Sequence, residues 1–217
     1  MNDNLSLFIP LSHEDVDCPD HKKYGPLSGN RAYYLIVPGL SLLSQTEIAK
    51  FCPKEKAFCL TKALQGQCYG KNVKAETLKR TCPCSCDAVH FDRIQSCCKA
   101  VGRREMEFCL PLCRYNTTLD ELSTGLGYKC VSQLTTWAYC AADVGDNTAC
   151  CKQRGIAPEC LSFCKGDVPT CDLQSLFTYQ PCLRYIGTIT HCHMENLHSV
   201  PRWDPEWTAR CDWDESD

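Results

Sequence analysis

The stretch that decides the fold reads CCKAVGRREMEFCLPLC over residues 97–113, and it returns in altered form as CCKQRGIAPECLSFC over residues 150–164. Each copy opens on two adjacent cysteines and ends on a Cys-x3-Cys segment, and two further cysteines follow at matching positions. Every gap between the six matching cysteines agrees to within two residues, and Cys171 is an addition in the second unit. This agreement indicates an internal repeat, with one unit over residues 97–140 and the other over 150–192. The repeated cysteines are Cys97, Cys98, Cys109, Cys113, Cys130 and Cys140 in the first unit and Cys150, Cys151, Cys160, Cys164, Cys182 and Cys192 in the second.

Each unit is predicted to consist of short helices joined by disulfides. The third and fourth cysteines of each unit lie one helical turn apart, so both sulfurs are expected on the same helix face. Adjacent cysteines diverge along a helix, so each doublet is expected to tie its helix to two different partners. Six cysteines allow 15 pairings, and the connectivity stays open. Gly155 and Gly166 stand where helix C-caps are expected, and Pro158 suits a first helical turn. We predict a small disulfide-rich, mainly α-helical fold with two three-helix layers packed on each other.

Composition places the chain outside the cell. Of 217 residues, 21 are cysteine, about 10%, which is typical of disulfide-stapled secreted proteins. The longest apolar run, residues 33–43, is interrupted by Pro38 and Gly39 and is shorter than the roughly 20 residues that span a bilayer, so no membrane insertion is expected. Residues 1–11 lack the features of a signal peptide, and we expect the cysteine content to be the better indicator of secretion.

Charge is unevenly distributed along the chain. Residues 50–114 hold 13 Lys and Arg against 6 Asp and Glu, whereas residues 193–217 hold 2 against 7. Solvated faces explain this pattern simply. The alternatives are an acidic tail that folds onto a basic module, or a basic face that binds an anionic partner.

The part before the repeats divides into an arm and a second cysteine cluster. Residues 1–51 contain one cysteine, Cys18, and are predicted to be loop with one short helix, because Ser44 to Glu47 form a capping box and Leu43 can pack on Ile48. The cluster that follows, over residues 52–90, contains Cys52, Cys59, Cys68, Cys82, Cys84 and Cys86.

The repeats resemble a known family. The run CCKQRGIAPECLSFC at 150–164, with CLPLC at 109–113 and CAAD at 140–143, is similar to the DB module, an extracellular cysteine-rich domain with no assigned biochemical activity. The resemblance extends over residues 91–192. It implies an extracellular location and brings no catalytic residue.

The cluster at 52–90 resembles a ShKT domain, a six-cysteine fold known from channel-blocking toxins. Residues 59–68 match its Cys-x8-Cys segment, and residues 77–86 resemble its ending, although the closing cysteines here are spaced Cys-x-Cys-x-Cys. The toxins use a Lys-Tyr pair to block pores, whereas this segment has Lys71 and Lys74 without such a pair. An ion-channel modulator is therefore an alternative function that the residues support weakly.

No pattern in the sequence indicates an enzyme, a cofactor or a metal site. The cysteines at 82–86 could be interpreted as a metal-thiolate knot, and thiol-rich metal binding is a further alternative, but oxidised cysteines cannot ligate a metal. His191, His193, Glu195 and His198 form one local group of ligand types, and His191 and His193 converge only if the helix has ended before them. Surface histidines at a helix end are expected instead.

The acidic tail, residues 193–217, is rich in tryptophan. Trp203 and Trp207 lie four apart, with Pro205 between them arguing for a turn. We expect them to pack on the repeats, and the alternative is an exposed anchor for a protein partner.

The cysteines left over are Cys18, Cys171 and Cys211. Because 21 is odd, one of the three is expected to be unpaired or to link a second chain into a dimer, and Cys18 and Cys211, in the arm and the tail, are the expected candidates. Asn4 and Asn116 lie in N-glycosylation sequons. The sequence thus predicts a secreted, non-catalytic protein that binds an extracellular or cell-surface protein and no nucleic acid.

Overall fold

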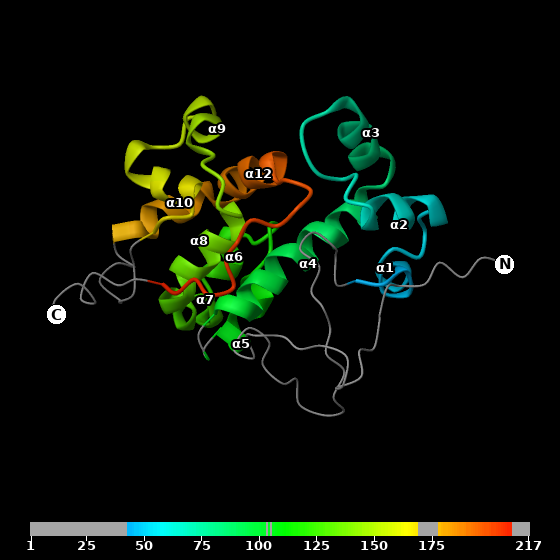
Figure 1. The fold of residues 1–217 in the computed structure, drawn as a ribbon. Helices are drawn as coiled ribbons and strands as arrows, with labels where there is room; N and C mark the ends of the chain where they lie inside the picture. Colours follow the sequence, from blue (N-terminus) through cyan, green and yellow to red (C-terminus); the bar gives the residue numbers. More distant parts are fainter. Residues whose placement is uncertain (1–42, 103, 105, 169–177, 210–217) are drawn as a thin grey trace, which may run out of the picture. The chain divides into compact units, whose positions relative to one another are not determined.

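The regular structure of the described residues consists of α-helices and short 3-10 turns, with no strand (Figure 1). This computed structural model describes residues 43–102, 104, 106–168 and 178–209, which all lie in one of the two units into which the chain divides, Gly39–Asp217. The small disulfide-rich helical fold predicted above is confirmed.

Three helices precede the repeats: α1 (Gln45–Phe51), α2 (Ala57–Leu64) and α3 (Val73–Thr81). The predicted capping box of α1 is confirmed, because Ser44 accepts the backbone N–H of Glu47 while the Glu47 side chain accepts the N–H of Ser44 at 2.7 Å. Burial of Ile48 then fixes α1 against the core.

The longest helix, α4 (Pro83–Val101), joins the first cysteine cluster to the repeats. It begins with proline in its first turn, where the missing N–H costs no hydrogen bond. It carries Cys84 and Cys86 of the first cluster at one end and the Cys97-Cys98 doublet at the other, and it contacts α1, α2 and α3 as well as α8. The boundary expected between residues 90 and 91 thus falls inside one continuous helix.

The first repeat continues through α5 (Met106–Cys109), η1 (Leu110–Leu112), α6 (Leu119–Leu122), α7 (Gly125–Lys129), η2 (Val131–Gln133) and α8 (Leu134–Ala142). The second consists of α9 (Thr148–Gln153), η3 (Pro158–Cys160), α10 (Leu161–Lys165), η4 (Gln180–Tyr185) and α12 (Ile186–Asn196). The predicted turn chemistry is confirmed, since Pro158 starts η3 and Gly166 ends α10 with φ +71°.

All eighteen cysteines of the three sequence clusters are disulfide-bonded within their own cluster. Both repeats join their first cysteine to the sixth, the second to the fourth and the third to the fifth. The cluster at 52–90 is connected differently, first to fifth, second to fourth and third to sixth. The shared connectivity of the repeats supports a duplication, and each doublet ties its helix to two partners as predicted.

The prediction that the third and fourth cysteines of each unit share one helix is wrong. In the second unit Cys160 ends the 3-10 turn η3 and α10 begins only at Leu161. The first unit shows the same break. Cys109 and Cys113 do not share an α-helix, because α5 ends at Cys109 and a 3-10 turn containing Pro111 follows. Proline disfavours the α conformation in the residue before it, so the helix ends before Pro111. The two sulfurs bond different partners, Cys130 and Cys98.

The two repeats pack through their helices α8 and α10. Gly166 makes this possible, since a Cβ there would lie 2.6 Å from the Ala142 Cβ and 2.9 Å from the Ala138 carbonyl oxygen. The cystines contribute much of the interior, which also contains Ile94, Phe163 and Ile189, all nearly inaccessible to solvent.

Candidate binding surface

A mostly apolar groove lies between the small helices of the first repeat and η4 of the second. Its volume is about 530 Å³. Leu119 and Tyr128 line it and remain 43% and 60% exposed. The other lining residues include Met106, Leu112, Leu122, Leu134, Trp137 and Ile186. Exposed apolar side chains beside a groove make this surface a candidate interaction site.

The wall that carries Leu119 is held by polar contacts around α6. Thr118 and Glu121 form a capping box at its start, and Arg114 forms an ion pair with Glu121. These hydrogen bonds, the one from Arg114 first, lower the pKa of Glu121. Gly127 lets α7 pack closely on α6, because a Cβ at this position would overlap the carbonyl of Leu122.

The base of the groove is fixed as firmly as its wall. The indole of Trp137 donates to the Leu112 carbonyl oxygen at 3.1 Å, and the buried Thr117 hydroxyl donates to the same oxygen at 2.7 Å. The exposed Arg184 lies at the groove with its guanidinium 4.9 Å from the ring centroid of Tyr185. Among the described residues Arg184 forms no ion pair, so the groove is apolar with one available cation.

Of the two sequons, that of Asn116 lies in the described part of the chain. Asn116 is exposed, and its two neighbours, Tyr115 and Thr117, are buried. It lies two residues before Thr118, the N-cap of α6. Asn4 lies outside the described residues.

The two tryptophans of the tail that the structure describes, Trp203 and Trp207, pack on the core. Trp207 stacks on Tyr139 with ring centroids 4.0 Å apart and planes 6° from parallel, and Trp203 is half-buried against the core. The backbone turns at Pro205, as expected, because the N–H of Trp207 donates to the carbonyl oxygen of Asp204. Packing on the repeats, the first of the two interpretations, agrees with these contacts. A partner anchor at Trp203 and Trp207 stays untested.

Sequence reasoning missed a buried ion pair that holds this tail. Arg93 donates to the carboxylate of Asp143 at 3.0 Å, with the two side chains only 4% and 0% exposed. Arg93 also donates to the carbonyl oxygens of His198 and Ser199, at 2.7 and 2.8 Å, and its guanidinium lies 4.3 Å from the centre of the Tyr69 ring. Burial raises the pKa of Tyr69 to about 12. Fifty residues separate Arg93 from Asp143, and no local signal connects them.

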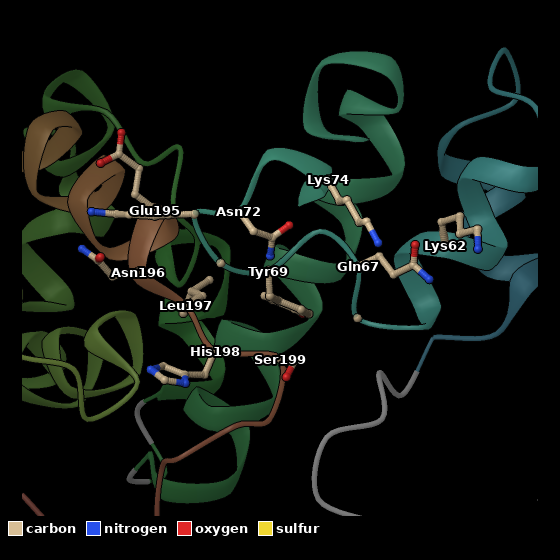
Figure 2. A pocket seen from close by; sticks show the side chains of 13 residues that line it. Lys62, Gln67, Tyr69, Asn72, Lys74, Glu195, Asn196, Leu197, His198 and Ser199 are labelled. Atoms are coloured by element: carbon tan, nitrogen blue, oxygen red, sulfur yellow. The ribbon is translucent and has the colours of Figure 1, made fainter. Parts of the chain in front are cut away.

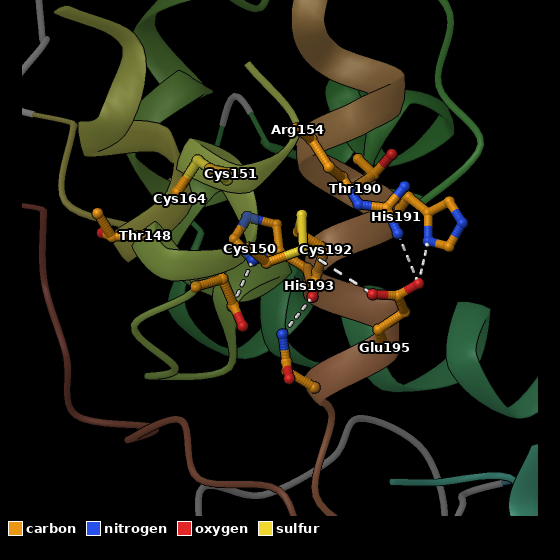
Figure 3. The surroundings of a disulfide bond; sticks show 12 residues. Thr148, Cys150, Cys151, Arg154, Cys164, Thr190, His191, Cys192, His193 and Glu195 are labelled. Atoms are coloured by element: carbon orange, nitrogen blue, oxygen red, sulfur yellow. Dashed lines mark hydrogen bonds and ion pairs between the residues drawn. A yellow bond between two sulfur atoms is a disulfide. The ribbon is translucent and has the colours of Figure 1, made fainter. Parts of the chain in front are cut away.

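The histidines around Cys192 do not form a metal cluster (Figure 3). The helix α12 continues past them, so His191 is exposed and contacts Glu195 at 3.3 Å, whereas His193 points into the interior. Within the described ranges no group of three His, Cys, Asp or Glu side chains is arranged to hold a metal. Glu195 is engaged instead by Arg154, at 2.7 Å, next to the Cys150–Cys192 disulfide.

The expectation of surface histidines at a helix end is wrong for His193, which is 1% exposed and has a structural role. Its Nε2 lies 3.1 Å from the Phe163 carbonyl oxygen, which can only accept, so Nε2 carries the hydrogen and Nδ1 accepts from the Asn147 amide at 2.8 Å. Burial lowers the pKa of His193 to about 4.

The cluster at 52–90 keeps its one tyrosine inside. Tyr69 is 9% exposed, and its hydroxyl donates to the carbonyl oxygen of Val89. Neither Lys71 nor Lys74 therefore has an exposed tyrosine beside it in this cluster, and a Lys-Tyr surface pair is not formed there. The sulfurs of the proposed metal-thiolate knot at 82–86 are all disulfide-bonded.

Three cysteines, Cys18, Cys171 and Cys211, lie outside the described residues. None of the described helices combines the length and the apolar character needed to cross a bilayer. Neither the comparison with curated proteins nor that with solved structures found a match to this chain. The family comparison did: residues 97–193, which contain both six-cysteine repeats, match the model of the DB module, a cysteine-rich extracellular domain family.

Proposed function

We propose that this protein is secreted, has no catalytic activity, and binds an extracellular or cell-surface protein through the apolar groove of its first repeat. The match to an extracellular domain family supports the location. The disulfides support the mode of action, because a cross-linked surface loses little conformational entropy when it binds.

The observation that carries the proposal is the combination of exposure and rigidity at the groove. Leu119 and Tyr128 are accessible, while the backbone beneath them is held by Trp137 and the Cys109–Cys130 disulfide. Interfaces are enriched in such aromatic residues on a pre-formed surface. Arg184 adds a cation at the groove, so the occupant we propose is an apolar protein segment with an acidic residue positioned to meet Arg184.

The alternative functions gain less support. Channel block of the toxin type needs an exposed Lys-Tyr pair, and Tyr69 is buried. Thiol-based metal binding needs free thiolates, and eighteen cysteines are oxidised.

The proposal is tested with the secreted full chain against a panel of purified ectodomains. A bound ectodomain is titrated with the wild type, with the groove variant Leu119→Ser/Tyr128→Ser, and with the control variant Val73→Ser/Val200→Ser, which removes exposed apolar side chains elsewhere. We expect the groove variant to raise Kd at least tenfold and the control to leave it unchanged. Equal binding by the wild type and the groove variant would refute the groove as the recognition surface.

We further propose that one of Cys18, Cys171 and Cys211 has no partner within the chain and can link two copies. The mass of the secreted protein before and after reduction tests this, since a linked dimer halves in mass on reduction. A monomer before reduction removes the dimer from consideration.

A further inference from the structure

A second cleft, distinct from the apolar groove, lies between the cluster at 52–90 and the segment that follows α12 (Figure 2). Its volume is about 830 Å³. One wall consists of Lys62 of α2, the loop between α2 and α3, and the start of α3. The other consists of residues 195–199, which are the end of α12 and the segment after it. Figure 2 shows the side chains of Lys62, Gln67 and Lys74 close together on the first wall, with His198 and Ser199 on the second.

The cleft carries unbalanced positive charge. Lys62, Lys71 and Lys74 line it, and none of them takes part in an ion pair formed within the described residues. Glu195 is the one carboxylate among the lining residues, and its carboxylate is engaged by Arg154 and His191. Three uncompensated cations on one concave surface attract an anionic ligand.

The remaining lining groups are hydrogen-bonding rather than apolar. Gln67, Asn72 and Asn196 contribute amides, and Ser199 contributes a hydroxyl. The apolar lining residues Tyr69 and Leu197 are buried, at 9% and 2% exposure. The cleft therefore lacks the accessible aromatic or aliphatic anchor on which a peptide partner depends. A ligand rich in hydroxyl groups and negative charge fits it better.

Both walls are fixed in place. Arg93 donates to the carbonyl oxygens of His198 and Ser199, and the ammonium of Lys79 donates to that of Gly70 at 3.2 Å. Lys79 is itself paired with Glu76 at 3.1 Å, so it supports the wall rather than adding a free charge to the cleft. The cations are thus presented on backbone that is already ordered before a ligand arrives.

From these observations we propose that the lysine-lined cleft binds a sulfated polysaccharide, with Lys62, Lys71 and Lys74 contacting sulfate groups and the amides contacting sugar hydroxyls. Positive charges gathered in a concave surface raise the local concentration of an anionic ligand, and sulfate groups along a sugar chain supply several negative charges at once. The proposal is independent of the apolar groove and of its protein partner.

The test uses the secreted full chain and heparin as the probe. Affinity is measured by calorimetry over a range of sodium chloride concentrations for the wild type, for Lys62→Gln/Lys71→Gln/Lys74→Gln, and for the control Lys129→Gln/Lys152→Gln/Lys165→Gln, which removes the same charge from exposed lysines that do not line the cleft. Equal thermal midpoints of the three proteins establish that all are folded.

We expect the cleft variant to bind heparin at least tenfold more weakly than the wild type and the control to bind within about twofold. The slope of log Kd against log salt concentration is expected to fall by about 2–3 in the cleft variant, because about one counterion is released for each charge contact. Loss of affinity of equal size in both variants would overturn the proposal, since attraction would then depend on net charge alone. Absence of heparin binding by the wild type would overturn it as well.

Two further probes decide the class of ligand. Polyglutamate represents acidic protein segments, and vesicles containing anionic phospholipid represent a membrane surface. Binding of either probe through the three lysines as tightly as heparin would reject a sulfated polysaccharide as the occupant. Weak binding of both supports it.

Discussion

Replacement of Asp143 by asparagine should destabilise the protein, because it leaves the buried charge of Arg93 without its carboxylate partner. The Asp143 carboxylate accepts from the guanidinium of Arg93 at 3.0 Å and from the backbone N–H of Arg202 at 2.9 Å. The side chains of Asp143 and Arg93 are both buried. Asp143 has φ +49°, in the left-handed region, which asparagine tolerates well. The substitution therefore removes the charge with little change to the backbone.

The size of the effect follows from burial. Removing one partner of a buried ion pair leaves an uncompensated charge and costs about 3–5 kcal/mol of unfolding free energy. For a chain of this length that corresponds to a fall in Tm of about 6–20 °C. Because Arg93 also holds the carbonyl oxygens of His198 and Ser199, the segment that carries Trp207 should loosen at the same time.

Denaturant unfolding with the disulfides intact measures the free energy, and limited proteolysis follows the release of residues 199–209. The control is Glu195→Gln, which breaks the ion pair with Arg154; those side chains are 28% and 37% exposed, so a loss of no more than about 1 kcal/mol is expected. If Asp143→Asn also costs less than about 1 kcal/mol, the reasoning about the buried pair is wrong.

Three further predictions concern pH, packing and glycosylation. His193 and His90 are buried, and burial lowers their pKa values to about 4 and about 3. The unfolded chain therefore binds more protons than the folded one below about pH 6.5, and stability should fall from there towards pH 4, by about 3 kcal/mol for His193. In denaturant titrations His193→Gln should flatten this part of the curve of stability against pH. Gly166→Ala should cost about 1–3 kcal/mol because its Cβ meets α8, whereas Gly187→Ala, with open space around it inside α12, should stabilise by about 0.5–1 kcal/mol; the opposite order of Tm values would contradict the packing described. The exposed Asn116 should carry a glycan in protein from secreting cells, and Asn116→Gln should remove the mass that glycosidase treatment otherwise releases.

Local patterns predicted local structure well. The spacing of cysteines divided eighteen of them into the three groups that the structure closes, and the capping box at Ser44 and the turn at Gly166 follow from residues within one turn of each other. These features depend on contacts between residues close in sequence, which single-sequence patterns record.

Contacts between distant residues were not predictable in the same way. How the helices pack determines the Arg93–Asp143 pair, the stacking of Trp207 on Tyr139 and the groove itself. Nothing in the sequence around one residue of such a contact indicates which distant residue it will meet. Disulfide connectivity stayed open for the same reason, because six cysteines in one cluster are equally acceptable partners until the helices are placed.

The grouping of the disulfides has a consequence for how the chain oxidises. None of the nine bridges joins one cluster to another, and the clusters follow one another along the chain without overlap. Eighteen cysteines considered together can pair in roughly 34 million ways, whereas three separate sets of six have 15 ways each, or roughly 3,400 in combination. Once one set has closed within its own stretch of chain, its cysteines are no longer available as wrong partners for the other sets.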